Sequence, residues 1–168
     1  MKSLLKYALL FFTLNLLLSS CTANDEHFDF NEKSLVGIWH KTYIDDNENQ
    51  TTKFEYHFKN DHNYEVLGTV LDATSQELLG YWTRETGSYS LTGDQLLFHN
   101  IKSYFNNDQT RSYTEFENLE LQQSDFNYSR SVTIEFNDFM RKLVFIYPPC
   151  GPNESCVGSL TLEKSTVN

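Results

Sequence analysis

Apolar and polar residues alternate along most of the chain after residue 34, and this pattern predicts a succession of β-strands. Phe54, Tyr56 and Phe58 alternate with polar residues, and Ile134 and Phe136 do the same later in the chain. A period of two is typical of strands with one buried face. We expect ten strands, over residues 34–39, 54–58, 64–71, 78–84, 87–92, 96–99, 111–121, 132–136, 140–147 and 157–164.

Short turn-forming sequences separate these strands, and no stretch keeps a helical period over several turns. Residues 59–63, 92–95 and 137–138 are rich in Asn, Asp and Gly, which favour hairpin turns. Consecutive strands joined by hairpins form an antiparallel meander, and a long meander leaves open edges unless it closes on itself. We therefore predict an all-β fold, an antiparallel up-and-down barrel of about 8–10 strands. A two-sheet sandwich is the alternative.

The first 20 residues have the pattern of a secretory signal peptide. Lys2 and Lys6 precede an apolar run over residues 7–18, and Ser19 and Ser20 follow it. Positive, apolar and small residues in this order are typical of a signal that is later removed. The apolar run is too short for a transmembrane helix, which needs roughly 20 residues.

Leu18-Ser19-Ser20-Cys21 resembles the lipobox of bacterial lipoproteins. The resemblance implies that the thiol of Cys21 carries a diacylglycerol and that the chain is cut before it. It also implies that the N-terminal lipid attaches the protein to a membrane of the bacterial cell envelope. We expect the outer membrane, on its periplasmic face or at the cell surface. Residues 21–33 would then be the lipidated cysteine and a flexible acidic tether, and residues 34–168 the folded domain.

The acidic composition excludes one class of partner. The chain has 23 Asp and Glu against 13 Lys and Arg, a net charge of −10. Nucleic acids and anionic headgroups attract basic surfaces, so we expect no nucleic-acid partner. Membrane attachment would depend on the lipid, and not on a basic patch.

Cys150 and Cys156 flank a turn-rich loop, Gly-Pro-Asn-Glu-Ser. A short loop between neighbouring strands can bring two cysteines within disulfide distance, and an exported protein meets oxidising conditions. We therefore predict a Cys150–Cys156 disulfide. A metal site there would lack further ligands, because His99 is the last histidine of the chain.

The start of the domain, Leu35-Val36-Gly37-Ile38-Trp39, resembles the Gly-x-Trp signature of lipocalins. Small bacterial lipocalin-like domains, many of them lipoproteins, look similar, and residues 87–96 and 160–164 resemble their middle and last strands. The resemblance implies that Trp39 packs across the closed end of a barrel and that Gly37 lets the chain bend. Two features depart from it: no helix beside the barrel is evident, and Lys164 is the only basic residue in the last strand, where lipocalins have an arginine.

No catalytic motif is present in the chain. Gly-x-Ser-x-Gly, His-Glu-x-x-His and phosphate-loop sequences are all missing. His57 and His62 lie near Asp61, but such polar turns are usually solvated. Arg84 and Glu85 are expected at the surface. We therefore predict a protein that is not an enzyme and has no cofactor and no metal site.

Aromatic side chains are the remaining candidates for a functional site. A small barrel either fills its interior or encloses one small ligand. Because neighbouring residues of a strand point to opposite faces, at most one of Tyr81 and Trp82 points inward. We expect a lipid-anchored lipoprotein whose barrel binds a small apolar ligand or a partner protein; the alternative is a structural or interaction lipoprotein with a filled barrel. The candidate ligand-binding residues are Tyr43, Phe54, Tyr56, Phe58, Tyr81 and Trp82.

Overall fold

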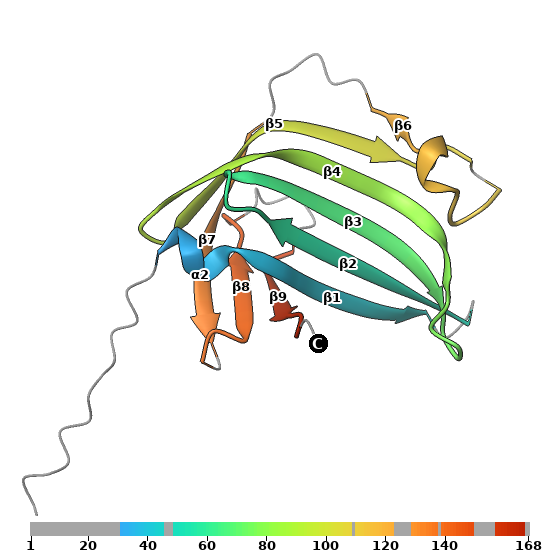
Figure 1. The fold of residues 1–168 in the computed structure, drawn as a ribbon, viewed down its shortest axis with the longest axis horizontal. Coiled ribbons are helices and arrows are strands. Elements are labelled where there is room, and N and C mark those ends of the chain that lie inside the picture. The colour runs from blue at the N-terminus through green and yellow to red at the C-terminus, as the bar shows by residue number, and fades with distance from the viewer. Residues whose placement is uncertain are drawn as a thin grey trace, which may run out of the picture.

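The computed structural model describes residues 31–45, 49–108, 110–122, 129–137, 139–149 and 157–166 (Figure 1). The predicted signal peptide, the lipidation at Cys21 and the disulfide between Cys150 and Cys156 lie outside these residues. The helices are α2 (Glu32–Leu35) and the 3₁₀ turn η1 (Phe116–Asn118). The strands are β1 (Gly37–Asp45), β2 (Gln50–Phe58), β3 (Asn63–Asp72), β4 (Leu78–Thr92), β5 (Gln95–Phe105), β6 (Glu120–Leu121), β7 (Arg130–Asn137), β8 (Lys142–Ile146) and β9 (Ser159–Lys164).

Eight of these strands close into a ring, which confirms the predicted all-β barrel. The ring follows the chain, β1-β2-β3-β4-β5-β7-β8-β9, and β9 pairs back with β1. Every pairing is antiparallel, so the barrel is of the up-and-down type. The seam is short, because it joins only Trp39 to Lys164 and His40 to Glu163. The ninth strand, β6, pairs with the outer part of β5.

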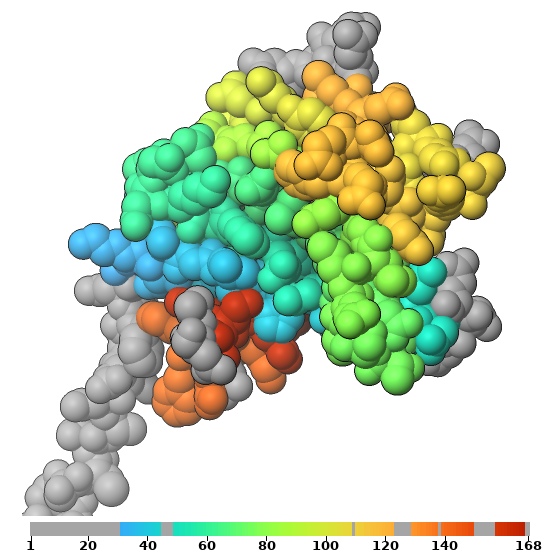
Figure 2. Space-filling model, turned by 45° about the vertical axis from the view of Figure 1, so that its right-hand side comes forward, coloured from blue at the N-terminus to red at the C-terminus, as the bar shows by residue number. Residues whose placement is uncertain are grey.

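Three of the predicted strands do not form as separate strands in the structure. Residues 78–84 and 87–92 form one strand, β4, because Glu85 and Thr86 continue the pairing with β3. The strand predicted over residues 111–121 is wrong. There Thr114 makes a single bridge to Tyr81, and η1 and β6 follow. The ring centres of Phe116 and Tyr81 are 5.2 Å apart, so this segment folds over the outer face of the barrel (Figure 2).

The first strand begins later than predicted. Residues 32–35 form α2, and β1 starts at Gly37. The indole Nε1 of Trp39 donates a hydrogen bond of 2.7 Å to the carbonyl of Leu35. This bond satisfies one of the carbonyls that the end of a helix leaves free, and it holds α2 against the barrel. Glu32 and Lys33, which the sequence places in the tether, belong to this helical turn.

Unequal strand lengths give the barrel two different ends. Strands β1–β5 contain 9 to 15 residues, whereas β7, β8 and β9 contain 8, 5 and 6. We call the end next to α2, where the ring closes, the closed end. At the other end, which we call the wide end, β1–β5 extend beyond the short strands as a curved sheet (Figure 1).

The hydrophobic core fills the part of the barrel that the ring closes. All of its fully buried members lie in α2, in the closed-end halves of β1–β5 or in the short strands. The turn between β4 and β5 consists of Gly93 and Asp94, and Gly93 has a φ of 59°, which glycine adopts without strain. The core residues are Leu35, Trp39, Phe58, Tyr64, Val66, Tyr89, Leu96, Phe98, Val132, Ile134, Leu143, Phe145 and Leu162.

Candidate functional site

The closed end is sealed by Trp39. Its side chain is fully buried, and its ring centre lies 5.5 Å from that of Phe136. The ammonium of Lys164 lies 4.9 Å from the centre of the Trp39 ring, a cation–π contact. Gly37 has a φ of 134°, a backbone conformation that residues with a side chain rarely adopt. Any ligand site inside the barrel must therefore lie towards the wide end.

Strand register identifies the side chains that face the interior. In antiparallel pairs, residues directly opposite each other point to the same face. Trp39 pairs with Tyr56, Tyr56 with Val66, and Val66 with Glu85. Because Trp39 is a core residue, Glu85 also points into the barrel, and its expected place at the surface is wrong. Arg130 also points inward, since it pairs with the core residue Phe98.

Glu85 and Arg130 form an ion pair inside the barrel. Arg130 Nη2 donates to Glu85 Oε1 at 2.8 Å, and Nη1 donates to Oε2 at 3.3 Å. The Tyr64 hydroxyl donates to the same Oε1 at 2.8 Å. The guanidinium lies 4.7 Å from the centre of the Phe98 ring. The side chains of Arg130 and Glu85 are 27% and 18% exposed, so the pair is largely but not wholly removed from water.

The pKa values of these groups follow from this environment. Burial, followed by the charge of Glu85 and the hydrogen bond to it, raises the pKa of Tyr64. Burial is the largest single influence on Arg130 and would lower its pKa. The charge of Glu85, the hydrogen bond to it and the nearby Tyr64 and Tyr56 together outweigh burial, and the pKa of Arg130 is raised. The tyrosine therefore stays neutral and the arginine stays charged at physiological pH.

Three aromatic rings form a row across the inner face of the wide end; we call Tyr43, Phe54 and Trp82 the aromatic row. The ring centres of Tyr43 and Phe54 are 5.9 Å apart, and those of Phe54 and Trp82 are 5.4 Å apart. Both contacts are edge-to-face, a geometry that aromatic pairs favour. Phe54 and Trp82 are partly exposed, and Tyr43 is 47% exposed. The wide end therefore presents apolar rings that the core does not cover.

A β-bulge and a glycine place Trp82 in this row. Gly68 pairs with Thr83 and Thr69 pairs with Tyr81, so Trp82 is the additional residue on β4. A Cβ atom on Gly68 would lie 2.4 Å from Trp82 Nε1 and 2.5 Å from Thr83 Cγ2. Only glycine leaves room for the indole to lie against β3.

Two tyrosine hydroxyls accompany the ion pair on the inner face. Tyr56 follows Phe54 in the inward alternation of β2, and Tyr147 follows Phe145 just after β8. Burial raises the pKa of both tyrosines, and the charges of Arg130 and Glu85 act on both. Within the described part of the chain, neither hydroxyl has a hydrogen-bond partner, and neither is closed off from solvent.

The structure separates the sequence-predicted ligand residues into three groups. The aromatic row and Tyr56 lie on the inner face at the wide end. Phe58 also points inward, but it is only 3% exposed and packs within the core. Tyr81 lies on the outer face against Phe116, so it does not line the interior, and Trp82 is the inward residue of the two.

The sequence analysis missed Glu85, Arg130 and Tyr147. The alternation itself contained a signal for Arg130, because Arg130 precedes Val132, Ile134 and Phe136 at intervals of two. The same spacing relates Glu85 to Gly87 and Tyr89. The charge of Glu85 had placed it at the surface, which is the usual position of unpaired charges. Only the register shows that the two are partners.

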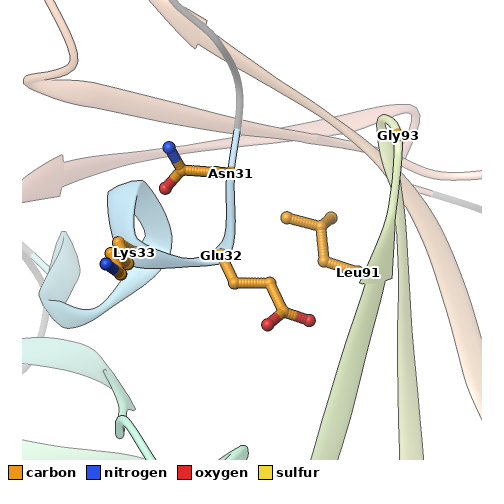
Figure 3. A pocket seen from close by; sticks show the side chains of 5 residues that line it. All are labelled: Asn31, Glu32, Lys33, Leu91 and Gly93. Carbon is orange, nitrogen blue, oxygen red and sulfur yellow. The ribbon is translucent and has the colours of Figure 1, made fainter.

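Two shallow depressions lie on the outside of the barrel. One, of about 470 Å³, lies between the Asn31–Lys33 segment and the β4–β5 turn with Leu91 and Gly93 (Figure 3). The other, of about 430 Å³, follows the outer face of β3–β5 and is lined mainly by polar residues, among them Glu65 and Arg84. Neither contains a member of the aromatic row, so neither competes with the wide end as an apolar site.

Searches for metal and membrane-spanning features concern the described residues only. No three His, Cys, Asp or Glu side chains among them are grouped as metal ligands would be. His62 instead bonds to Glu32, with Nε2 and Oε2 2.9 Å apart. No helix in the described ranges is long and apolar enough to span a bilayer.

Comparisons with known proteins give no assignment for this arrangement. No family model, no curated protein and no solved structure matches the chain. The function has to be argued from the site itself.

Proposed function

We propose that the chain is a lipid-anchored, non-catalytic lipoprotein of the bacterial cell envelope whose lipocalin-like barrel binds a small, mainly apolar molecule. The aromatic row at the wide end carries this proposal. Ligand pockets are lined chiefly by apolar and aromatic side chains with a few polar groups. Here the exposed ring of Tyr43 and the partly buried rings of Phe54 and Trp82 share the inner face with the Glu85–Arg130 pair.

The lipocalin-like part of the proposal draws support from Trp39 and Lys164. Lipocalins place a tryptophan across the closed end and stack an arginine on it, as the resemblance implies. In this chain Lys164 occupies that position above the Trp39 ring. A lysine ammonium can make the same cation–π contact, so the departure in sequence keeps the physical interaction.

Lipid anchoring is tested in the native bacterium. Cys21→Ser removes the thiol that would accept the lipid, and we expect the protein to leave the membrane fraction or to accumulate as an uncleaved precursor. The control is Cys150→Ser with Cys156→Ser, which removes both cysteines outside the lipobox and the disulfide predicted between them. Unchanged membrane partitioning of Cys21→Ser would contradict the anchor.

Ligand binding is tested with a fluorescent apolar probe, 1-anilinonaphthalene. We expect saturable binding to the full chain in a maltoside detergent, measured by equilibrium dialysis with the same detergent on both sides. Phe54→Ala removes the central ring of the aromatic row and should weaken binding at least fivefold, whereas Tyr104→Ala on the outer face should not. Equal binding by both variants would contradict a site at the wide end.

A partner protein is the second candidate, and the edge of β1 favours it. Beyond His40, the described strand β9 no longer pairs with β1. Ile44, on this part of β1, is 71% exposed. Free strand edges accept a further strand from a partner. Ile44→Lys should abolish such an interaction in a pull-down from envelope extract and leave probe binding unchanged.

A further inference from the structure

We infer that the ligand of the wide end is an uncharged molecule with an apolar, planar body and a hydrogen-bond acceptor such as a carbonyl oxygen. The inference rests on the proposed ligand-binding function and specifies its chemistry. Two properties of the inner face specify this chemistry: the hydrogen-bonding groups that still have capacity and the balance of charges.

The guanidinium of Arg130 supplies the charged donors that remain available on the inner face. A guanidinium carries five N–H groups, and Arg130 gives one from Nη1 and one from Nη2 to Glu85. Arg130 Nε is buried without a partner. The second N–H on each Nη makes no hydrogen bond to a described residue and is available to a ligand. Tyr56 and Tyr147 add two hydroxyls that no described residue engages.

Most acceptor sites of the Glu85 carboxylate are already used. Glu85 Oε1 accepts from both Arg130 and Tyr64, and Oε2 accepts from Arg130. A ligand that brings an acceptor can bind the charged N–H groups of Arg130, whereas a ligand that brings only donors would find one remaining site on Glu85 Oε2 and the neutral tyrosine oxygens. Leaving a desolvated donor unsatisfied costs about 1–3 kcal/mol, so the preference for an acceptor is substantial.

Charge balance distinguishes a neutral acceptor from an anion. The charge of Arg130 is compensated by Glu85 at 2.8 Å, and a ligand carboxylate there would lie beside a second carboxylate. Like charges close together in a partly desolvated site are unfavourable. The net charge of −10 on the whole chain also opposes the approach of anions.

One further cation lies on the inner face. Lys41 pairs in register with Phe54, and its ammonium is 5.7 Å from the centre of the Tyr43 ring. It therefore lies with the aromatic row, one inward-facing position closer to the wide end than Tyr56. At that position it contacts the body of a bound ligand and does not neutralise an anion placed at the Glu85–Arg130 pair.

The test compares three probes with the same naphthalene body. 2-Acetylnaphthalene carries a neutral carbonyl, 2-naphthoate carries a carboxylate, and 2-ethylnaphthalene carries neither. Each is measured by equilibrium dialysis against the full chain, with maltoside detergent on both sides. We expect the ketone to bind about five- to tenfold more tightly than the ethyl compound, as one or two net hydrogen bonds allow, and more tightly than the acid.

Conservative variants locate the donors. Tyr56→Phe with Tyr147→Phe should weaken binding of the ketone, although the Arg130 donors remain, and leave the affinity for the ethyl compound unchanged, which also shows that the variant is folded. Tyr104→Phe, on the outer face, is the matched control and should change neither affinity.

Each other outcome has a definite meaning. Tighter binding of 2-naphthoate overturns the neutral-ligand inference. Equal binding of the ketone and the ethyl compound overturns the acceptor and leaves the proposed apolar binding intact. An absence of binding by all three probes overturns the inference together with the proposed function.

Discussion

Replacing Arg130 by methionine should destabilise the barrel substantially, because it removes the only ion-pair partner of Glu85 within the described structure. Methionine keeps most of the apolar stem, so the change isolates the charge and its hydrogen bonds. The carboxylate of Glu85 would retain only the Tyr64 hydroxyl at 2.8 Å. A carboxylate that is largely shielded from water and has lost its cation must then rehydrate or take up a proton.

The magnitude follows from the geometry of the pair. Two unit charges about 4 Å apart interact by roughly 4 kcal/mol at an effective dielectric constant of about 20. The side chains are 27% and 18% exposed, so water screens part of this energy and desolvation offsets more. We expect Arg130→Met to lower the free energy of unfolding by about 2 kcal/mol, which is about 1 M in urea midpoint for a slope near 2 kcal/mol/M.

A double-mutant cycle in urea measures the interaction itself. Glu85→Gln keeps an acceptor for Tyr64 but removes the charge, and we expect the double variant to be less destabilised than the sum of the single ones by about 1–2 kcal/mol. Lys53→Met is the control, because the Lys53–Glu55 pair lies on the outer face with its atoms 3.0 Å apart. It should cost less than about 0.5 kcal/mol. A coupling energy below about 0.3 kcal/mol between Arg130 and Glu85 would refute the reasoning.

Three further predictions concern other parts of the barrel. Gly68→Ala places a Cβ 2.4 Å from Trp82 Nε1, so we expect a loss of about 1–3 kcal/mol in urea unfolding and a shift of tryptophan emission; Gly158→Ala, with no atom within 4 Å, should leave both almost unchanged. Lys164→Met should lower stability by about 0.5–1 kcal/mol through loss of the cation–π contact, and Lys164→Arg should restore it; equal stability of the two variants would contradict this contact. The pKa of Asp72 is lowered from 3.8 because backbone N–H groups of the next turn donate to its carboxylate. The stabilisation that the Asp72 carboxylate gives to the folded state is present above its unfolded pKa and is lost as pH falls through the lower folded value. The melting temperature of Asp72→Asn should therefore fall less between pH 6 and pH 3 than that of the unchanged protein. Parallel plots of melting temperature against pH for the two proteins would contradict this contribution.

The fold was largely predictable because periodicity in strands is a local property. Phe54, Tyr56 and Phe58 revealed β2 by alternation alone, and Gly93 revealed the turn between β4 and β5. Residues 111–121 defeated the same reasoning, because their apolar side chains do not alternate towards the core. Phe116 is instead held by Tyr81, a contact between residues 35 positions apart that no local pattern contains.

The site was only half predictable for a related reason. Aromatic residues in a strand are candidate interior residues whatever their partners, so Phe54 and Trp82 could be named in advance. Glu85 and Arg130 are tolerated inside only because each compensates the other, and their 45-residue separation hides this in the sequence. Their meeting depends on the pairing of β4 with β5 and of β5 with β7.

The position of α2 bears on how the proposed ligand would reach the wide end of the barrel. The chain enters the barrel at Asn31, beside the end that Trp39 seals. If Cys21 carries the proposed lipid anchor, the nine residues between Cys21 and Asn31 span at most about 30 Å. The sealed end is therefore the part of the barrel that is tethered to the bilayer. The aromatic row is then the part farthest from the attachment point. On the proposed function, a barrel held in this way would take up its ligand from the surrounding fluid or from an opposite surface.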